Sequence, residues 1–302
     1  MAALTQANYS HVVQKDLSEV FAVEYGEFQS MIPALFTTET PDQAIVYEQL
    51  LGGLGSVPVF DGEIYYDEAK QSYRKSTEEV PYAMGLKVTE KLRRNDLYGV
   101  VRTTVAELAD RFRAKRESLA ASIFNGAFST TTVADTLALC YSAHTSDVGG
   151  SNQGNAGSSV FSPANVEATR RLMIKFKTNR DNITTHFPDM LIVPTELEEQ
   201  AMTLIKSTKE VNTATNNINF HQGKYKLAVW HNWLSSGSTS ATADWFMVNS
   251  GLMKKYLKFY DWKNVEFFYA GEIDTITSKH AGYMSCNVSS AQWNWIYGMN
   301  IA

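Results

Sequence analysis

The residues from Val100 to Phe124 form the longest amphipathic pattern in the chain, and this pattern constrains the fold more than any other feature. Apolar residues recur along one face at a period close to 3.6, and charged residues occupy the rest of the surface. No proline interrupts the run, and Asn125-Gly126 supplies a stop signal at its end. At 1.5 Å per residue, such a helix is about 37 Å long. The pattern therefore predicts a helical strut in an extended subunit.

The composition is that of an ordinary globular protein, except for its aromatic residues. Of 302 residues, 44% are hydrophobic and 20% charged, which excludes a disordered chain and a coiled-coil fibre. The 15 Tyr, 15 Phe and 6 Trp exceed what a single core needs, and extra aromatic area is typical of interfaces. We predict that much of this surplus contacts neighbouring copies. The residues concerned are Phe21, Tyr25, Phe28, Tyr65, Tyr66, Tyr73, Tyr82, Trp293, Trp295 and Tyr297.

The charge and the cysteine content narrow the functional classes. A net charge of -5 argues against a general nucleic-acid coat, which needs a basic face to bind phosphate. The two cysteines form no CxxC pair, so neither a disulfide framework nor a zinc ribbon is predicted, and a reducing compartment fits best. No apolar run is long enough for a membrane span, and the first ten residues lack the order of a signal peptide. We expect a soluble protein made in the cytoplasm.

The N-terminal third predicts two extensions. The apolar spacing over 15–36 indicates an amphipathic helix that must dock elsewhere, as an arm. Residues 80–88 alternate with period two, and 63–66 offer an opposing strand. Between these strands, 67–79 carries charges of both signs. We therefore predict a long hairpin with a charged tip, which must lean on its own domain or on a neighbouring chain because a lone hairpin is marginally stable.

The C-terminal half predicts an α/β layer and a closing sheet. A Ser/Gly/Asn-rich stretch at 146–159 predicts a mobile or exposed loop. Ser162 with Pro163 begins a helix, the strand 190–193 is buried, and a capping box over 195–198 opens a helix through Lys206. Strands at 226–230 and 245–248 complete the layer. The segments 256–262, 265–270 and 274–289 are interpreted as successive strands of one sheet, and the pattern of the residues after them predicts no particular contacts.

The chain offers no catalytic constellation. Cys140 and His144 are spaced as a nucleophile and base would be, but their surroundings supply neither a helix N-terminus nor an oxyanion hole, so a structural loop is favoured. The glycines at 52–55 precede Val-Pro-Val-Phe rather than a helix, which favours a hinge over a phosphate loop. No two histidines have metal-ligand spacing. We predict no catalytic, cofactor-binding or metal-binding residues and no enzymatic activity.

The order of arm, hairpin, long helix, α/β layer and closing sheet is accompanied by eight weak motifs. They are LGSVPVF, NDLYGVV, FNGAFS, LCYSAH, FSPANVEATRRLMIKF, DMLIVPTELEEQAMTLIKS, INFHQGKYKLAVWHNWL and ADWFMVNSG. In this order the chain resembles a tailed-bacteriophage major capsid protein of the Hong Kong 97 fold, and within that group the Mu-like major head subunit. The resemblance implies an α+β fold with an N-arm, an E-loop hairpin, a long spine helix in a peripheral domain, and an α/β axial domain.

The resemblance also implies domain limits and a function. The N-arm would span 1–56, the E-loop 57–84, the peripheral domain 85–159 and 256–302, and the axial domain 160–255. The protein would self-assemble into the icosahedral shell that encloses the double-stranded DNA genome, and would be made in the host bacterial cytoplasm and end in the virion. An encapsulin-like compartment of the same fold, which encloses protein cargo, is the alternative. An enzyme using Cys140 and His144 is a more remote one.

The resemblance implies partners as well. The chain would form pentamers and hexamers of itself, with a separate scaffolding protein, a portal and decoration proteins, and would enclose DNA without sequence-specific binding and without a membrane. We expect deletion of 1–36 to block shell formation while leaving a folded core. The predicted intersubunit contacts are Phe21, Tyr25 and Phe28 on the arm, and Arg74, Lys75, Glu78 and Glu79 as ion pairs at the hairpin tip.

Overall fold

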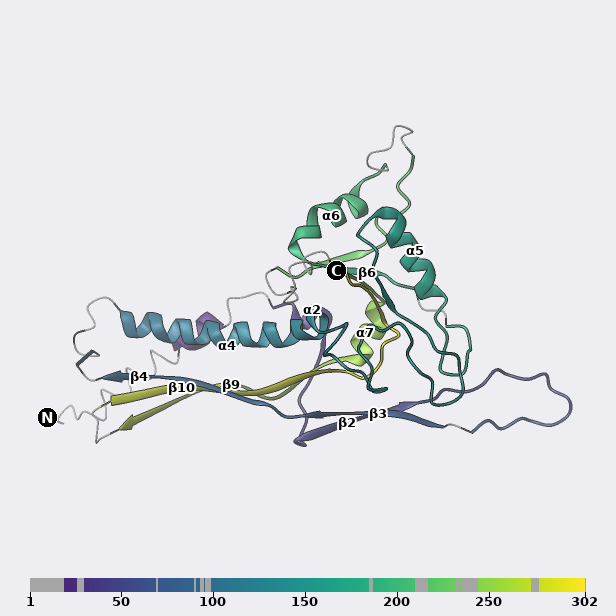
Figure 1. Ribbon diagram of the computed structural model, residues 1–302. Helices are drawn as coiled ribbons and strands as arrows, with labels where there is room; N and C mark the ends of the chain where they lie inside the picture. The colour runs from purple at the N-terminus through teal and green to yellow at the C-terminus, as the bar shows by residue number, and fades with distance from the viewer. Residues whose placement is uncertain are drawn as a thin grey trace.

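The molecule consists of a long lower layer, an upper lobe and a projecting hairpin (Figure 1). The computed structural model describes residues 19–25, 30–68, 70–89, 91–92, 95, 99–184, 187–209, 217–231, 234, 244–272 and 277–301. In the lower layer a long helix lies along a four-stranded sheet. The upper lobe is built on a second sheet of five strands.

The lower layer forms because one long helix covers a sheet whose strands come from both ends of the chain. The helix α4 (Val100–Asn125) confirms the predicted strut. Phe112 on α4 comes so close to β10 that a Cβ atom at Gly282 would lie 2.3 Å from its ring, so only glycine fits there. The sheet has the order β1-β9-β10-β4, with β1 parallel to β9 and the other pairs antiparallel. Its strands are β1 (Thr37–Glu39), β4 (Pro81–Thr89), β9 (Leu257–Glu272) and β10 (Thr277–Ser290).

The upper lobe contains the predicted α/β layer. Its sheet has the order β5-β11-β8-β6-β7. The strands are β5 (Ala156–Gly157), β6 (Met190–Val193), β7 (Lys226–Val229), β8 (Trp245–Val248) and β11 (Ile296–Met299). The helical elements are α5 (Pro163–Ile174), a 3-10 turn (Thr195–Leu197) and α6 (Glu198–Lys206). The shorter helices α7 (Ser250–Tyr256) and α2 (Ile32–Leu35) lie below α5 and α6, at the junction with the lower layer (Figure 1).

The two predicted helix starts of this lobe have different outcomes. The Ser162 hydroxyl accepts a hydrogen bond from the backbone N–H of Asn165 at 3.2 Å, so the predicted cap of α5 is confirmed. The capping box at 195–198 is wrong. Thr195 begins a 3-10 turn, and its hydroxyl lies 3.3 Å from His231 Nδ1 instead of capping α6.

The prediction that the segments between 256 and 289 are strands of one sheet is confirmed, because β9 and β10 pair in the lower layer. The chain after β10, whose contacts the sequence does not predict, crosses to the upper lobe, where β11 pairs with β8 and β5. All four residues of β11 are buried. A strand buried along its whole length needs a partner on each side, and β5 and β8 supply them.

The hairpin exists, but its strands differ from those predicted. β2 (Ile45–Leu51) pairs with β3 (Gln71–Glu78), with Ile45 opposite Glu78. The predicted pairing of 63–66 with 80–88 is wrong, because β4 instead pairs with β10 along its whole length. The alternating sequence pattern of β4 therefore reflects its pairing in the lower sheet and not in the hairpin. The apex of the hairpin is the segment between Leu51 and Gln71.

The core at the junction of the two layers is aromatic. Phe124 of α4 packs edge-to-face on Trp230, Phe246 and Trp295, and Phe36 packs likewise on Phe124, Trp230 and Phe259, with ring centroids 5.5 to 6.4 Å apart. These rings come from α4 and from residues in or next to α2, β7, β8, β9 and β11. Trp293, Trp295 and Tyr297 are at most 7% exposed. The prediction that these tail aromatics face neighbouring copies is wrong, because they belong to the chain's own core.

Candidate assembly surface

The apex of the hairpin, residues 52–70, carries the most exposed apolar side chains of the described chain, and we call it the loop tip. Val57, Val59 and Phe60 are 96%, 91% and 71% exposed. Ile64, Tyr65 and Tyr66 are exposed as well. The loop tip extends away from the body of the molecule (Figure 1). Contiguous apolar surface of this kind marks an interaction site, because leaving it in water costs free energy.

The base of the loop tip is tied to a neighbouring loop of the same chain. Arg180 Nη1 lies 2.6 Å from Asp67 Oδ2, and Arg180 Nη2 donates to the backbone oxygen of Glu68 at 2.9 Å. Asp67 also accepts from the backbone N–H of Gly55 at 2.6 Å, on the opposite side of the loop. The Gly55 hydrogen bond and Arg180 lower the pKa of Asp67. The two sides of the loop tip are therefore held together before any partner is bound.

We expect Arg180→Ala to loosen the loop tip. The pKa of Asp67 is lowered, so its ionised carboxylate stabilises the contact with Arg180 fully at pH values above the ordinary aspartate pKa of about 3.9. This stabilisation is lost as the pH falls through the lowered pKa. Asp67→Asn should therefore reproduce the effect at neutral pH. Chymotryptic cleavage at Tyr65 and Tyr66 should accelerate several-fold in both variants. The exposed-arginine variant Arg171→Ala is the control, and unchanged cleavage in the Arg180 variant would contradict the assignment.

The four charged residues predicted for the tip lie elsewhere. Arg74, Lys75 and Glu78 belong to β3, which is one strand of the stem of the hairpin, and Glu79 directly follows β3. Lys75 Nζ donates to the backbone oxygen of Thr132 at 2.6 Å, and burial lowers its pKa. The Arg74 guanidinium stacks over the Tyr47 ring at 4.6 Å. Within the described ranges none of the four is in a salt bridge, and their ion pairs with a neighbouring copy stay a prediction.

The described part of the arm packs on the lower layer of its own chain. Residues 19–25 are helical. Phe21 is 5% exposed, and its ring lies 5.1 Å from that of Phe267 and 6.3 Å from that of Phe112. Tyr25 stacks on Phe21 and stays partly accessible. Phe28 lies outside the described residues. The chain's own core thus covers Phe21, and a contact of the arm with a neighbour remains a prediction.

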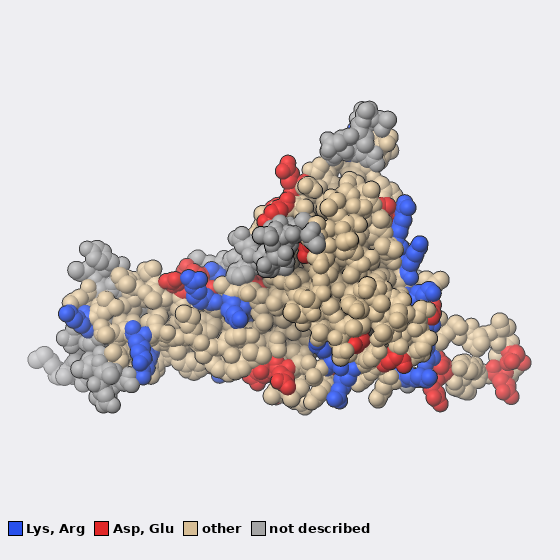
Figure 2. All heavy atoms as spheres, viewed as in Figure 1, with Lys and Arg blue, Asp and Glu red and all other residues tan. Residues whose placement is uncertain are grey.

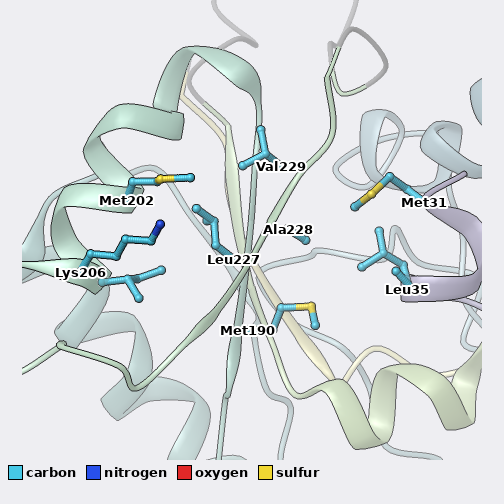
Figure 3. Close-up of a pocket in the computed structure, with 10 residues that line it drawn as sticks. Met31, Leu35, Met190, Met202, Lys206, Leu227, Ala228 and Val229 are labelled. Carbon is cyan, nitrogen blue, oxygen red and sulfur yellow. The ribbon is translucent and has the colours of Figure 1, made fainter. Parts of the chain in front are cut away.

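An apolar groove opens where the arm meets the upper lobe, and we call it the junction groove. It has a volume of about 510 Å³. Met31, directly before α2, and Leu35 of α2 lie on one side, and Met202 of α6 and Leu227 of β7 lie on the other (Figure 3). Lys206 of α6 stands at its edge, and Met190 of β6 forms part of the wall. Sequence reasoning missed this site because its walls come from four separate segments.

The candidate nucleophile and base are not brought together. Cys140 is buried, and burial raises the pKa of its thiol. The ring nitrogens of His144 lie 2.7 Å from Asp135 Oδ2 and 3.1 Å from Asn155 Oδ1, and the ring stacks on Trp293. Both nitrogens are thus directed to other partners. The geometry supports the structural interpretation of this loop.

Both cysteines should resist thiol reagents in the folded chain. Cys140 and Cys286 are buried, and burial raises the pKa of Cys286 to about 11. Because the thiolate is the reactive form, neither thiol should react with a disulfide reagent at pH 8 until denaturant is added. Counting titrated thiols before and after unfolding tests this. Rapid reaction of one thiol in the native protein would contradict it.

The Ser/Gly/Asn-rich loop is exposed in its middle and fixed at its end. Gly149, Ser151 and Asn152 are exposed, as predicted. Asn155, by contrast, is fully buried, and its amide donates to the backbone oxygens of Leu139 and Ile296 at 2.8 and 3.1 Å. This asparagine ties the loop to β11, a role that no local pattern in the sequence indicates.

The described residues contain neither a membrane-spanning helix nor a metal site of recognisable composition. None of their helices is both long and apolar enough to cross a bilayer. No three His, Cys, Asp or Glu side chains among them gather in a way that would hold a metal ion. The features that remain for function are the loop tip and the junction groove, which are apolar surfaces suited to contact with protein.

This chain is similar in fold to solved capsids of bacteriophages and of a GTA particle. The capsid of bacteriophage JBD30 decorated with minor capsid protein trimers aligns with a TM-score of 0.58 and 12% identity, over 69% of this chain and 92% of that one. The capsid of a native GTA particle gives 0.60 and 7%, over 92% of each chain. The mature capsid of bacteriophage PhiM1 gives 0.60 and 9%, over 91% of this chain and 88% of that one. No curated protein matches in sequence.

A family model supplies the assignment that structural likeness alone does not. The model described as phage capsid protein matches residues 74–278, which is more than half of the chain. The matched range includes β4, the long helix, the upper lobe except β11, the strand β9 and the start of β10. The likeness in fold to the GTA capsid covers 92% of this chain, which is more than the family model covers. The chain therefore belongs to the phage capsid protein family, as a major capsid protein that forms the shell.

Proposed function

We propose that the subunit builds its shell through rings of five and six copies, in which the loop tip of each copy contacts the next. The exposure of Val57, Val59 and Phe60 carries this proposal. These side chains have no cover in their own chain, so association removes apolar surface from water at about 25 cal/mol per Å². A surface patch that binds a different patch on an identical copy makes rings when the rotation closes. Five- and six-membered rings together tile an icosahedral shell.

Hong Kong 97-type roles follow for the parts of the chain. The hairpin β2–β3 with the loop tip would be the E-loop, α4 the spine helix, the lower sheet the peripheral domain, and the upper lobe the axial domain. The motifs in register favour the Mu-like head subunit as the type. We propose a separate scaffolding protein, a portal and decoration proteins as partners, and assembly in the host bacterial cytoplasm.

The shell would enclose double-stranded DNA without binding it tightly. The net charge of -5 supports this, because a lining that does not neutralise phosphates leaves the packaged DNA mobile. The family match favours DNA over the protein cargo of an encapsulin-like compartment.

Electron microscopy of the purified full-length chain, alone and with the candidate scaffolding protein of its phage, tests the proposal. Closed particles with five- and six-fold clusters are expected, and particles from a phage lysate should contain DNA. A chain that stays monomeric under both conditions, or particles filled with protein alone, would overturn the proposal.

A further inference from the structure

We propose that the loop tip of one copy inserts into the junction groove of the next, with Phe60 as the anchoring side chain. This inference rests on the proposed shell function and deepens it, because it names the surface that receives the loop tip. The groove is an apolar hollow at the surface of the described chain, and the loop tip carries exposed apolar side chains.

The dimensions fit. An apolar cavity of about 150 Å³ is enough to hold a benzene ring. The junction groove has about 510 Å³, which accommodates the Phe60 ring together with the two flanking valines. Methionines contribute to two of its facing walls, Met31 directly before α2 and Met202 from α6 (Figure 3). Their flexible thioether side chains adapt to the shape of an aromatic guest.

The charges are complementary. Asp61 and Glu63 follow Phe60 directly and are exposed, and acidic side chains are visible at the end of the loop tip (Figure 2). Lys206 stands at the groove edge, and Lys209 is exposed just after α6. An inserted Phe60 would thus place two carboxylates near the ammonium group of Lys206, which lines the groove. Such pairing at the rim favours one register and speeds association more than it adds affinity.

The placement of the two surfaces requires a second copy. Phe60 is 71% exposed, so it does not occupy the groove of its own chain. The loop tip projects from one side of the molecule, whereas α2 and α6, which border the groove, lie in the body of the molecule, away from the loop tip (Figure 1). A contact between two different patches is head-to-tail, and head-to-tail contacts close into rings.

A larger hollow of the upper lobe is a weaker receptor. It lies between α5 and α6 and has a volume of about 1030 Å³. Charged side chains line it, including Glu167, Arg171 and Glu199, and Glu167 is already paired with Arg170 and Arg171. Burying the apolar loop tip there would strip water from these charges without new partners.

Cysteine cross-linking in assembled shells tests the inference. The variant Phe60→Cys/Met202→Cys should give, on oxidation, a ladder of linked subunits ending at five or six. The control Phe60→Cys/Leu172→Cys places the second thiol on exposed α5 and should link about tenfold less, because a disulfide needs Cα atoms within about 7 Å. The native cysteines are buried and add no background. Mixing the two single variants should give linked dimers, which shows that separate copies are joined.

The outcomes separate the two proposals. Shells in which Phe60→Cys links to Leu172→Cys, but not to Met202→Cys, would overturn the groove assignment and leave the shell function intact. A wild-type chain that forms no shells would overturn both.

A photo-reactive benzoylphenylalanine at position 60 serves if the double variant does not assemble, because it keeps an aromatic ring at the anchor. Cross-linked peptides should then contain Met31, Met202 or Leu227. Cross-links that map to α5, or to a scaffolding or decoration protein, would also overturn the groove assignment.

Discussion

Replacing Val57, Val59 and Phe60 together by serine is expected to abolish shell assembly while the subunit stays folded. Each of these side chains is worth roughly 1.5–3 kcal/mol when fully buried, so their loss weakens a contact by about 5 kcal/mol or more. That change corresponds to more than about a thousandfold in the association constant of one contact. The stability of the subunit should not change, because all three side chains are already in water.

Sedimentation velocity and electron microscopy measure the assembly, and urea unfolding measures the subunit. The matched controls are Val160→Ser and Ile218→Ser, which remove side chains that are 60% and 84% exposed in the upper lobe. Shells of normal yield from the triple variant would refute the role of the loop tip. An equal loss of assembly in the controls would show that apolar surface matters generally rather than at this loop.

Replacing Phe36 by alanine is expected to lower the free energy of unfolding by about 3–5 kcal/mol. Phe36 is 2% exposed and packs on Phe124, Trp230 and Phe259, so it joins the segment after α2 to α4 and to both sheets. Val23→Ala is the control in the same segment. It removes a side chain that is 59% exposed and should change stability by no more than about 0.5 kcal/mol.

The same packing corrects the expected result of the arm deletion. Phe21, Ile32, Leu35 and Phe36 are all at most 5% exposed, so a chain without residues 1–36 lacks part of its core. We expect this truncation to be largely unfolded by circular dichroism and urea titration, instead of leaving the folded core anticipated from the sequence. A cooperative unfolding transition equal to that of the full chain would show that the arm contributes nothing to the core.

The helices and most strands could be predicted because their signals are local. α4 was visible as an uninterrupted 3.6-residue pattern, α5 as Ser162 followed by Pro163, and β8 as a short apolar run. Each signal depends on residues within a few positions of one another. The motif order was enough to indicate the capsid family, which the family match then confirmed.

The pairing of strands could not be predicted with the same success. β4 alternates as any half-buried strand does, and nothing in its residues states that β10, almost two hundred positions later, is its partner. β11 follows β10 closely yet joins the other sheet. For the same reason, Arg74, Lys75, Glu78 and Glu79 were assigned to the tip of the hairpin, although they lie in β3 or directly after it. The glycines at 52–55 were interpreted as a hinge and residues 63–66 as a strand, although both segments belong to the loop tip.

The sequence by itself determined the local elements, their order and the family, because periodicity and capping are properties of neighbouring residues. Only the tertiary structure decided which aromatic residues are core and which are surface. Trp295 and Phe60 are equally apolar, but strand pairing and helix packing bring Phe124 onto Trp295 and leave Phe60 in water. Burial is a property of the whole chain in space, so the loop tip and the junction groove could be seen only once the chain was folded.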